Sequence, residues 1–300
     1  MAHDVIGKTI RYLDKNRRYL VEDPSFFVMK SLARFEFARN RASRPSPVTA
    51  SGAVHSSHVS VQHSMSEVLS TLKREGYYVG LTLTPETVSS LQEAARTNKC
   101  FADRRADEAF YIAERESVEQ RLGRKMKVAS YFDQQESWPA FAALRNDPVL
   151  LGIARAYLGC SPVYMRSEVL WSFPAQSTRE ELREAAQTFH CDINDFRTIK
   201  FFFHLSDVGP GSGPHMYIKK GPRHRTLFHQ ALGQRITSLP ESSLLETYRS
   251  NDVVSVQGKA GTGFAGDPYY FHKGETPKSD TRLLAQLEFG CRSYRMWYVY

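Results

Sequence analysis

The sequence predicts a mainly β domain, a sandwich or barrel with helices packed on one sheet, behind helical N-terminal residues. Three observations lead to this class. Helical patterns come first along the chain, and short β-type runs alternate with Gly/Pro turns from Pro162 onward. The 300 residues are 41% hydrophobic, which is enough to bury a sizeable core. No stretch approaches about 18 consecutive apolar residues, so we expect no transmembrane segment.

Residues 1–42 are predicted to form a basic helical extension. Residues 1–50 hold ten Lys/Arg against five Asp/Glu, a large part of the net charge of +8. Apolar residues recur at helical spacing on both sides of Pro24, as Ile6, Ile10 and Leu13 and then as Val28, Leu32 and Phe35. We expect packing helices with solvated basic faces, and the alternative is weak contact with an anionic surface.

Residues 43–65 are rich in Ser, Pro and small residues, which is typical of a linker or loop. The folded domain, residues 66–300, then opens with helices and one strand. The first helix has Ser64 and Glu67 in capping-box spacing and stops at Gly76. The strand "YYVGLTL" follows, Thr84 and Pro85 open a second helix, and "WPAFAALRNDPVLLGIARAYLG" supplies further helix.

The second half of the domain is predicted to be strands. The runs are "VYMRSEVLWSF", "TIKFFFHLS", "PHMYIKK", "DVVSVQG", "YYFHK" and "RLLAQLEFG". In "TIKFFFHLS", alternation places Lys200, Phe202 and His204 on one face of the strand. The segment "STREELREAAQ" interrupts the strands just before His190. It reads as an exposed helix, and we expect either a simple solvated helix or a lid over a site.

Metal-ligating side chains occur in a pattern that points to iron. If the backbone is extended, His190 and Asp192 point the same way and Cys191 points away. His272 is a third candidate, 80 residues after Asp192. Two imidazoles and one carboxylate leave coordination positions open, as in non-haem Fe(II) oxygenases. Arg282 follows ten residues later and can grip a second carboxylate through parallel hydrogen bonds. A dicarboxylate that chelates the metal at one end and meets Arg282 at the other is 2-oxoglutarate.

These residues, in this order and spacing, resemble the phytanoyl-CoA dioxygenase-like family of Fe(II)/2-oxoglutarate oxygenases. Three further segments of the sequence are similar to that family: "LKREGYYVGLTLTPETVSSLQEA", "DPVLLGIARAYLGCSPVYM" and "GSGPHMYIKKGPRHR". In the last of these, Gly213, Pro214, Gly221 and His224 match, whereas Pro222-Arg223 and an extra lysine depart from the pattern. The resemblance covers about residues 66–292.

The resemblance implies a double-stranded β-helix, a jelly-roll of the cupin type. It implies that His190, Asp192 and His272 bind Fe(II), and that Arg282 holds 2-oxoglutarate with Phe202 beside it. Arg166, Trp171, Lys200 and His204 are expected in the substrate pocket. The implied reaction consumes O2 and 2-oxoglutarate and hydroxylates a small molecule, or a carrier-, lipid- or sugar-linked metabolite. Desaturation or cyclisation would use the same ligands, while the retained Asp192 favours hydroxylation over halogenation.

Two rival functions remain at this point. One is a non-catalytic barrel that binds a ligand or partner. The other is an oxygenase acting on nucleic acid, which ranks last because no strand combines aromatic and basic residues as a platform; we expect no nucleic-acid partner. The four cysteines are far apart, without a CxxC pair, which favours reduced thiols and a cytoplasmic location.

Overall fold

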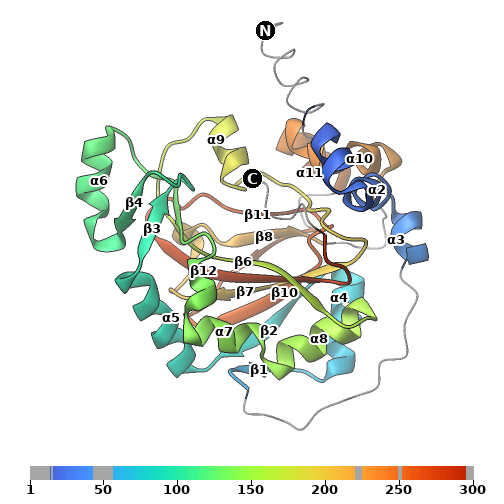
Figure 1. Ribbon diagram of the computed structural model, residues 1–300, viewed down its shortest axis with the longest axis horizontal. Coiled ribbons are helices and arrows are strands. Elements are labelled where there is room, and N and C mark those ends of the chain that lie inside the picture. The colour runs from blue at the N-terminus through green and yellow to red at the C-terminus, as the bar shows by residue number, and fades with distance from the viewer. Residues whose placement is uncertain (1–13, 15, 43–56, 220–224, 249–251, 295–300) are drawn as a thin grey trace, which may run out of the picture.

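The chain forms two antiparallel sheets that face each other, the arrangement of a jelly-roll (Figure 1). The computed structural model describes residues 14, 16–42, 57–219, 225–248 and 252–294. The larger sheet has nine strands in the order β1-β2-β10-β7-β12-β6-β5-β3-β4, and the smaller has the order β11-β8-β9. Among the described helices, none is long and apolar enough to cross a membrane.

The strands are β1 (Val59–Val61), β2 (Tyr77–Leu83), β3 (Lys99–Ala102), β4 (Ala109–Tyr111), β5 (Val128–Ser130), β6 (Val163–Ser172), β7 (Thr198–His204), β8 (His215–Ile218), β9 (Val253–Val256), β10 (Thr262–Gly266), β11 (His272–Gly274) and β12 (Arg282–Gly290). The helices are α2 (Pro24–Leu32), α3 (Glu36–Ala42), α4 (Met65–Glu75), α5 (Pro85–Thr97), α6 (Arg115–Leu122), α7 (Pro139–Arg145), α8 (Pro148–Leu158), α9 (Arg179–Glu184), α10 (Leu227–Leu232) and α11 (Glu241–Tyr248). Residues 16–22 are also helical, and short 3-10 helices span Ile112–Glu114, Gln134–Ser137, Pro210–Ser212 and Gly233–Ser238.

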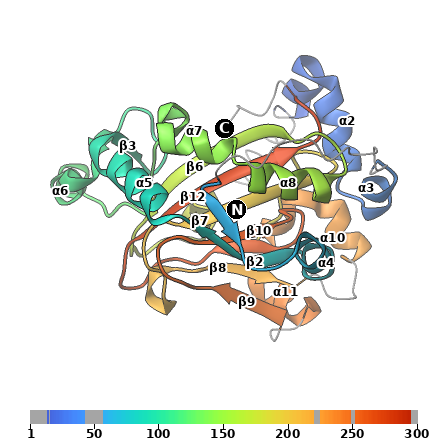
Figure 2. The same ribbon diagram turned by 90° about the horizontal axis from the view of Figure 1, so that it is seen from below.

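Helices α4, α5, α7 and α8 cover the outer face of the nine-stranded sheet, as the two views show (Figures 1 and 2). The main hydrophobic core lies between these helices and the sheet, and the predicted class of helices packed on one sheet is therefore confirmed. Local signals in the sequence also fold as expected. Ser64 and Glu67 form the capping box of α4, Gly76 ends it in the left-handed conformation, and Thr84 caps α5.

The central strands β7 and β12 divide their side chains between two environments. Ile199, Phe201 and Phe203 of β7 point into the core under the helices, whereas Phe202 packs between the sheets against Tyr217 and Phe264. The register pairs Glu288 with Lys200 and Gln286 with Phe202. The alternation predicted for "TIKFFFHLS" is confirmed, and it leaves a row of polar side chains in the space between the two sheets.

The N-terminal residues differ from the prediction in the face that packs. Phe26 and Met29 of α2 are buried, whereas Val28 and Leu32 are exposed, at 52% and 44%. The segment is helical, as the apolar spacing predicted, but the face that carries Phe26 and Met29 packs against the barrel instead of the face that carries Val28 and Leu32. Ile6, Ile10 and Leu13 lie outside the described residues.

The segment predicted as a linker includes a strand. Residues 59–61 form β1, which pairs with β2 at the edge of the large sheet. The residues just before it are also tied to the domain, because the backbone nitrogen of His58 donates to Asp147. Residues 43–56 lie outside the described part of the chain.

The expectation of four reduced cysteines is wrong for one pair. Cys160 and Cys291, which are 131 positions apart in the sequence, form a disulfide with their Cα atoms 6.0 Å apart. Strand β12 pairs with β6 through Gly290 and Val163, and this pairing brings the two cysteines together. Sequence spacing alone does not reveal such a contact. Cys100 and Cys191 are free and buried. The disulfide removes the support that reduced thiols lent to a cytoplasmic location, which stays a prediction.

Candidate active site

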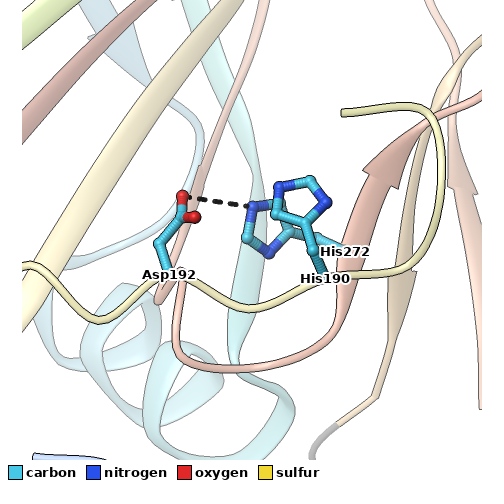
Figure 3. A group of neighbouring side chains, drawn as sticks. All are labelled: His190, Asp192 and His272. Carbon is cyan, nitrogen blue, oxygen red and sulfur yellow. Dashed lines mark ion pairs between the residues drawn. The ribbon is translucent and has the colours of Figure 1, made fainter. Parts of the chain in front are cut away.

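His190 and His272 come from segments that the fold places side by side. His190 precedes β7, and His272 is the first residue of β11. Their backbones form an antiparallel bridge in which each nitrogen donates to the other's carbonyl oxygen at 3.0 Å. The imidazole centroids lie 4.3 Å apart, and the Asp192 carboxylate points toward them (Figure 3). The three predicted ligands therefore meet at one point, although 80 residues separate Asp192 from His272.

Both imidazoles are oriented by their own backbone. Nδ1 of His190 lies 2.9 Å from the carbonyl oxygen of Thr188, and Nδ1 of His272 lies 2.9 Å from that of Tyr270. A proton on Nδ1 satisfies each carbonyl and leaves the Nε2 lone pair free for a metal. Burial lowers the pKa of His190, and it lowers the pKa of His272 to about 3, so both rings are neutral near pH 7.

The third ligand is held as an anion. Burial alone would raise the pKa of Asp192, but nearby positive charge, chiefly Lys200, holds it well below its usual range. Nε2 of His272 lies 3.8 Å from Oδ2 of Asp192, and one atom from each of the three ligands lies within 4.8 Å of the others. Two neutral imidazoles and one carboxylate match the donor set of non-haem Fe(II) sites, so the residues present fit that metal.

A cluster of charged residues surrounds the carboxylate ligand. Nζ of Lys200 contacts Oδ2 of Asp192 and lies 3.7 Å from Oε2 of Glu288. Glu288 also accepts from Nε of Arg166 at 3.1 Å and from Nδ2 of Asn194 at 3.0 Å. Because Glu288 and Asp192 together carry two negative charges, they balance the two cations Lys200 and Arg166 beside the metal ligands.

Arg282, the first residue of β12, is buried in the same cavity. Its Nη1 donates to the carbonyl oxygen of Gly213, and its Nη2 donates to Oγ of Ser172 at 3.2 Å. Its Nε has no hydrogen-bond partner, and burial lowers the pKa of the guanidinium to about 10. Among the described residues, no carboxylate lies within ion-pair distance of it. A cation this buried favours an anionic partner, and a carboxylate of 2-oxoglutarate fits that requirement.

Small residues keep the space beside Arg282 open. A Cβ added to Gly274 would lie 2.8 Å from Nη2 of the guanidinium. Gly213 has φ +69°, where a side chain would be strained, and its carbonyl oxygen is one of the groups that orient Arg282. On the side of these two glycines, only backbone approaches the arginine.

The cavity has a volume of about 430 Å³ and holds most of the predicted site residues. His190, Asp192, His272 and Arg282 line it, and so do Phe202, Lys200 and Arg166. Phe202 stacks on Phe264 with the ring centroids 4.9 Å apart, which fixes its position in the wall. The structure thus brings these residues together around one cavity, and the role of each in binding stays a proposal.

Two predicted pocket residues lie elsewhere. Nε1 of Trp171 donates to Oη of Tyr131 at 2.9 Å, and the Trp171 side chain packs against the main core. The reason is the alternation of β6, which turns Arg166, Glu168 and Leu170 toward the cavity and Trp171 away from it. His204 shares the inward face of β7 but does not line the cavity, because its Nε2 lies 3.3 Å from the carbonyl oxygen of Val256.

Other predictions concern neighbours of the ligands. The Cys191 side chain packs with Phe189 and Phe271, and its Sγ donates to the carbonyl oxygen of Gly233 at 3.5 Å, while the residue also borders the cavity. Asp267 stabilises the turn before His272 by accepting from the backbone nitrogen of Tyr269 at 2.9 Å. His215 is buried, lines the cavity and stacks against His272. Nδ1 of His229 lies 2.7 Å from Oη of Tyr248. His224 lies outside the described residues.

Several residues around the cavity escaped the sequence interpretation. Gln286 and Glu288 share the inward face with Arg282, so the period of two along "RLLAQLEFG" was a usable signal for them. Arg104 comes from a loop, where no pattern marks it, and forms an ion pair with Glu168 at 2.8 Å. The helix predicted just before His190 is present as α9, and its Glu181 pairs with Lys127 at 2.8 Å. Whether it acts as a lid stays a prediction.

Comparison with known proteins supports the fold. No protein-family profile matches the sequence, and no curated protein sequence matches it either. Among solved structures, the non-haem α-ketoglutarate-dependent epimerase SnoN from nogalamycin biosynthesis, in complex with Fe³⁺, α-ketoglutarate and nogalamycin RO, superposes with a TM-score of 0.51 and 15% identity. That match covers 78% of this chain and 87% of SnoN. HygX from Streptomyces hygroscopicus, with nickel and 2-oxoglutarate bound, gives 0.50 and 14% identity over 75% of this chain and 86% of HygX. At this identity the likeness establishes the jelly-roll fold.

Proposed function

We propose that this protein is an Fe(II)- and 2-oxoglutarate-dependent dioxygenase that hydroxylates a small molecule. The observation that carries the proposal is the meeting, in one cavity, of the His190–Asp192–His272 group and the buried Arg282. A structural arginine would be expected to face a carboxylate of the protein, whereas Arg282 faces a cavity beside three ligand side chains. SnoN and HygX, which share the fold, have been solved with 2-oxoglutarate or its synonym α-ketoglutarate bound.

Each residue has a distinct task in this proposal. His190, Asp192 and His272 hold Fe(II) through two Nε2 atoms and a carboxylate oxygen. Arg282 binds the far carboxylate of 2-oxoglutarate, and Phe202 forms the apolar wall beside the co-substrate. When bound, iron and the oxo acid supply the oxidising chemistry, in which O2 and 2-oxoglutarate yield succinate, CO2 and a hydroxylated substrate. Lys200 keeps Asp192 ionised, and Glu288 helps to hold Lys200 and Arg166 in place beside it.

The cavity wall favours a hydrophilic substrate. Nε and Nη2 of Arg104 meet the Glu168 carboxylate at 2.8 and 3.2 Å, and Nε2 of Gln286 joins the same carboxylate at 2.9 Å. Burial opposes ionisation of Glu168, but Arg104 outweighs it, so the pKa of Glu168 is lowered. A long acyl chain would displace water from these polar groups without offering them hydrogen bonds in return, which costs free energy. A small polar metabolite therefore suits the cavity better than a lipid-linked one, and the resemblance to phytanoyl-CoA dioxygenases concerns the site rather than the substrate.

The test is co-substrate turnover in the absence of a primary substrate. The protein is purified without oxygen, loaded with Fe(II) and given labelled 2-oxoglutarate in air. We expect slow release of labelled succinate, and no release above background from His190→Ala. Equal release from both proteins would overturn the proposal and return the fold to the alternative of a non-catalytic binding barrel.

A further inference from the structure

The N-terminal helices pack against the back of the segments that carry the metal ligands. Phe26 and Met29 of α2 form a buried cluster with Ile193 and Tyr269. Ile193 directly follows Asp192, and Tyr269 lies three residues before His272. Helices α2 and α3 sit beside α10 at one side of the barrel (Figure 1). The N-terminal residues that lie outside the family resemblance therefore contact both halves of the metal site from behind.

One charged residue of α3 touches both ligand segments. The side chain of Arg39 is buried, with 7% of it exposed. Its Nη2 lies 3.4 Å from each carboxylate oxygen of Asp267, and its Nη1 donates to the carbonyl oxygen of Asp195 at 3.5 Å. The guanidinium carbon stands 4.0 Å from the centroid of the Tyr269 ring. Asp195 lies three residues after Asp192, and Asp267 lies five residues before His272.

The partner of Arg39 organises the turn that leads to His272. The carboxylate of Asp267 accepts from Oη of Tyr157 at 2.8 Å and from the backbone nitrogen of Tyr269 at 2.9 Å, while its carbonyl oxygen accepts from the nitrogen of Tyr270 at 3.1 Å. The same turn also contacts the segment of Asp192 directly, because the backbone nitrogen of Asp192 donates to the carbonyl oxygen of Pro268 at 2.7 Å. A shift of the turn would therefore be transmitted to both Asp192 and His272.

From these contacts we infer that Arg39 is a positioning residue for the metal site. It ties the Asp195 and Asp267 ends of the two ligand segments together and so sets the separation between Asp192 and His272. This inference rests on the proposed iron site. Metal affinity depends strongly on groups that orient the ligands, and losing one costs about 10- to 100-fold. The N-terminal helices are on this view part of the active-site scaffold.

The test is Fe(II) affinity in three variants, measured by anaerobic titration in the presence of saturating 2-oxoglutarate. Arg39→Ala should weaken Fe(II) binding about tenfold or more and change the wavelength of the Fe(II)–2-oxoglutarate absorption band at saturation. Arg39→Lys should recover part of the affinity, because it restores a cation beside Asp267. Arg41→Ala is the matched control, since Arg41 is exposed on the same helix, and it should match wild type.

The outcomes separate this inference from the proposed function. If wild type itself gives no band, the iron site is wrong. If wild type gives a band and folded Arg39→Ala has the same affinity and the same band, Arg39 has no positioning role. If Arg39→Ala fails to fold, the decision passes to Arg39→Lys and Asp267→Asn, whose wild-type affinities would likewise overturn the inference. Thermal unfolding monitored by circular dichroism establishes which variants are folded.

Discussion

Two buried arginines near the same three ligands stand in opposite surroundings. Arg282 is 3% exposed and has no carboxylate partner among the described residues, whereas Arg39 is 6% exposed and pairs with Asp267. The first faces the cavity, and the second lies behind the segments that form it. Equal burial therefore does not imply an equal role. The fold supplies a counterion for Arg39, whereas Arg282 lacks one among the described residues, and for that reason we assign it to ligand binding in our proposal.

Removing a proposed metal ligand should have the largest effect, because a ligand would bond the metal directly, whereas the two arginines would act on the site through other groups. His272→Ala leaves two ligands, and we expect 2-oxoglutarate turnover to fall to background, a loss of at least about 100-fold. Succinate release is the measurement. His63→Ala is the control, since His63 lies near the surface with its Nδ1 3.1 Å from Oη of Tyr78. Turnover in His272→Ala within a few-fold of wild type would show that His272 is not a ligand.

Replacing the two arginines should change the unfolding free energy of the ligand-free protein by different amounts. Arg39→Ala leaves the buried Asp267 carboxylate without its ion pair, a change that costs about 3–5 kcal/mol of unfolding free energy. Arg282→Met removes a buried cation that has no carboxylate partner, so we expect little loss or a gain. Denaturant unfolding of iron-free protein gives both values. A larger loss of unfolding free energy in Arg282→Met than in Arg39→Ala would show that Arg282, and not Arg39, is the arginine that stabilises the fold.

Co-substrate affinity should respond to Arg282 in particular. Arg282→Ala removes charge-assisted hydrogen bonds worth about 1.5–3 kcal/mol, which raises the dissociation constant for 2-oxoglutarate about 10- to 100-fold. Fe(II) affinity without 2-oxoglutarate should stay near that of wild type, because Arg282 touches none of the three ligands. Calorimetric titration on iron-loaded protein checks the first expectation and anaerobic Fe(II) titration the second. An unchanged 2-oxoglutarate constant would remove Arg282 from the site.

The stability of the protein should depend on pH through His204, a buried histidine near Arg282. Burial, and then Arg282 itself, lower the pKa of His204 to about 4. Because the unfolded chain takes up this proton first, near pH 6.5, His204 contributes stability above that pH and loses it as the pH falls toward 4. At pH 5 the loss is about 2 kcal/mol. Iron-free His204→Gln should therefore lose less stability than wild type between pH 7 and pH 5. Parallel curves for the two proteins would contradict this.

The smallest expected effect concerns the outer side of the N-terminal helices. Arg17 and Arg18 are exposed, at 73% and 56%, and each pairs with Asp14. We expect Arg17→Gln/Arg18→Gln to weaken binding to anionic vesicles about threefold, without changing turnover. Co-sedimentation with vesicles containing phosphatidylserine is the measurement. Deleting residues 1–42 would not test this point, because the deletion also removes Arg39 and the cluster behind the ligands.

The sequence predicted what local patterns encode. Capping residues and the period of two in β7 are short-range signals, and both match the structure. The spacing of the proposed ligands and Arg282 extends from His190 to Arg282, and the structure brings these residues to one cavity. The Gly-rich strand β10, "TGFAG", was missed because it lacks strand-type composition. Trp171 was assigned to the pocket wrongly because the sequence of the strand does not show which of its two faces points into the cavity.

Long-range contacts were beyond the sequence. The Cys160–Cys291 disulfide depends on the pairing of β6 with β12, and the Arg39–Asp267 ion pair joins residues 228 positions apart. A basic helical segment usually carries its charges in solvent, so nothing local distinguished Arg39 from Arg41. Only the packing of α3 against the ligand segments reveals which arginine is buried.

The central claim is that one cavity holds Fe(II) through His190, Asp192 and His272 and holds 2-oxoglutarate through Arg282. The most direct test is anaerobic addition of Fe(II) and 2-oxoglutarate to wild type, His190→Ala and Arg282→Ala, followed by visible absorption. We expect a weak metal-to-ligand band in wild type, no band in His190→Ala, and a band in Arg282→Ala only at much higher 2-oxoglutarate concentration. Absence of the band in wild type, or the same band in His190→Ala, would contradict it.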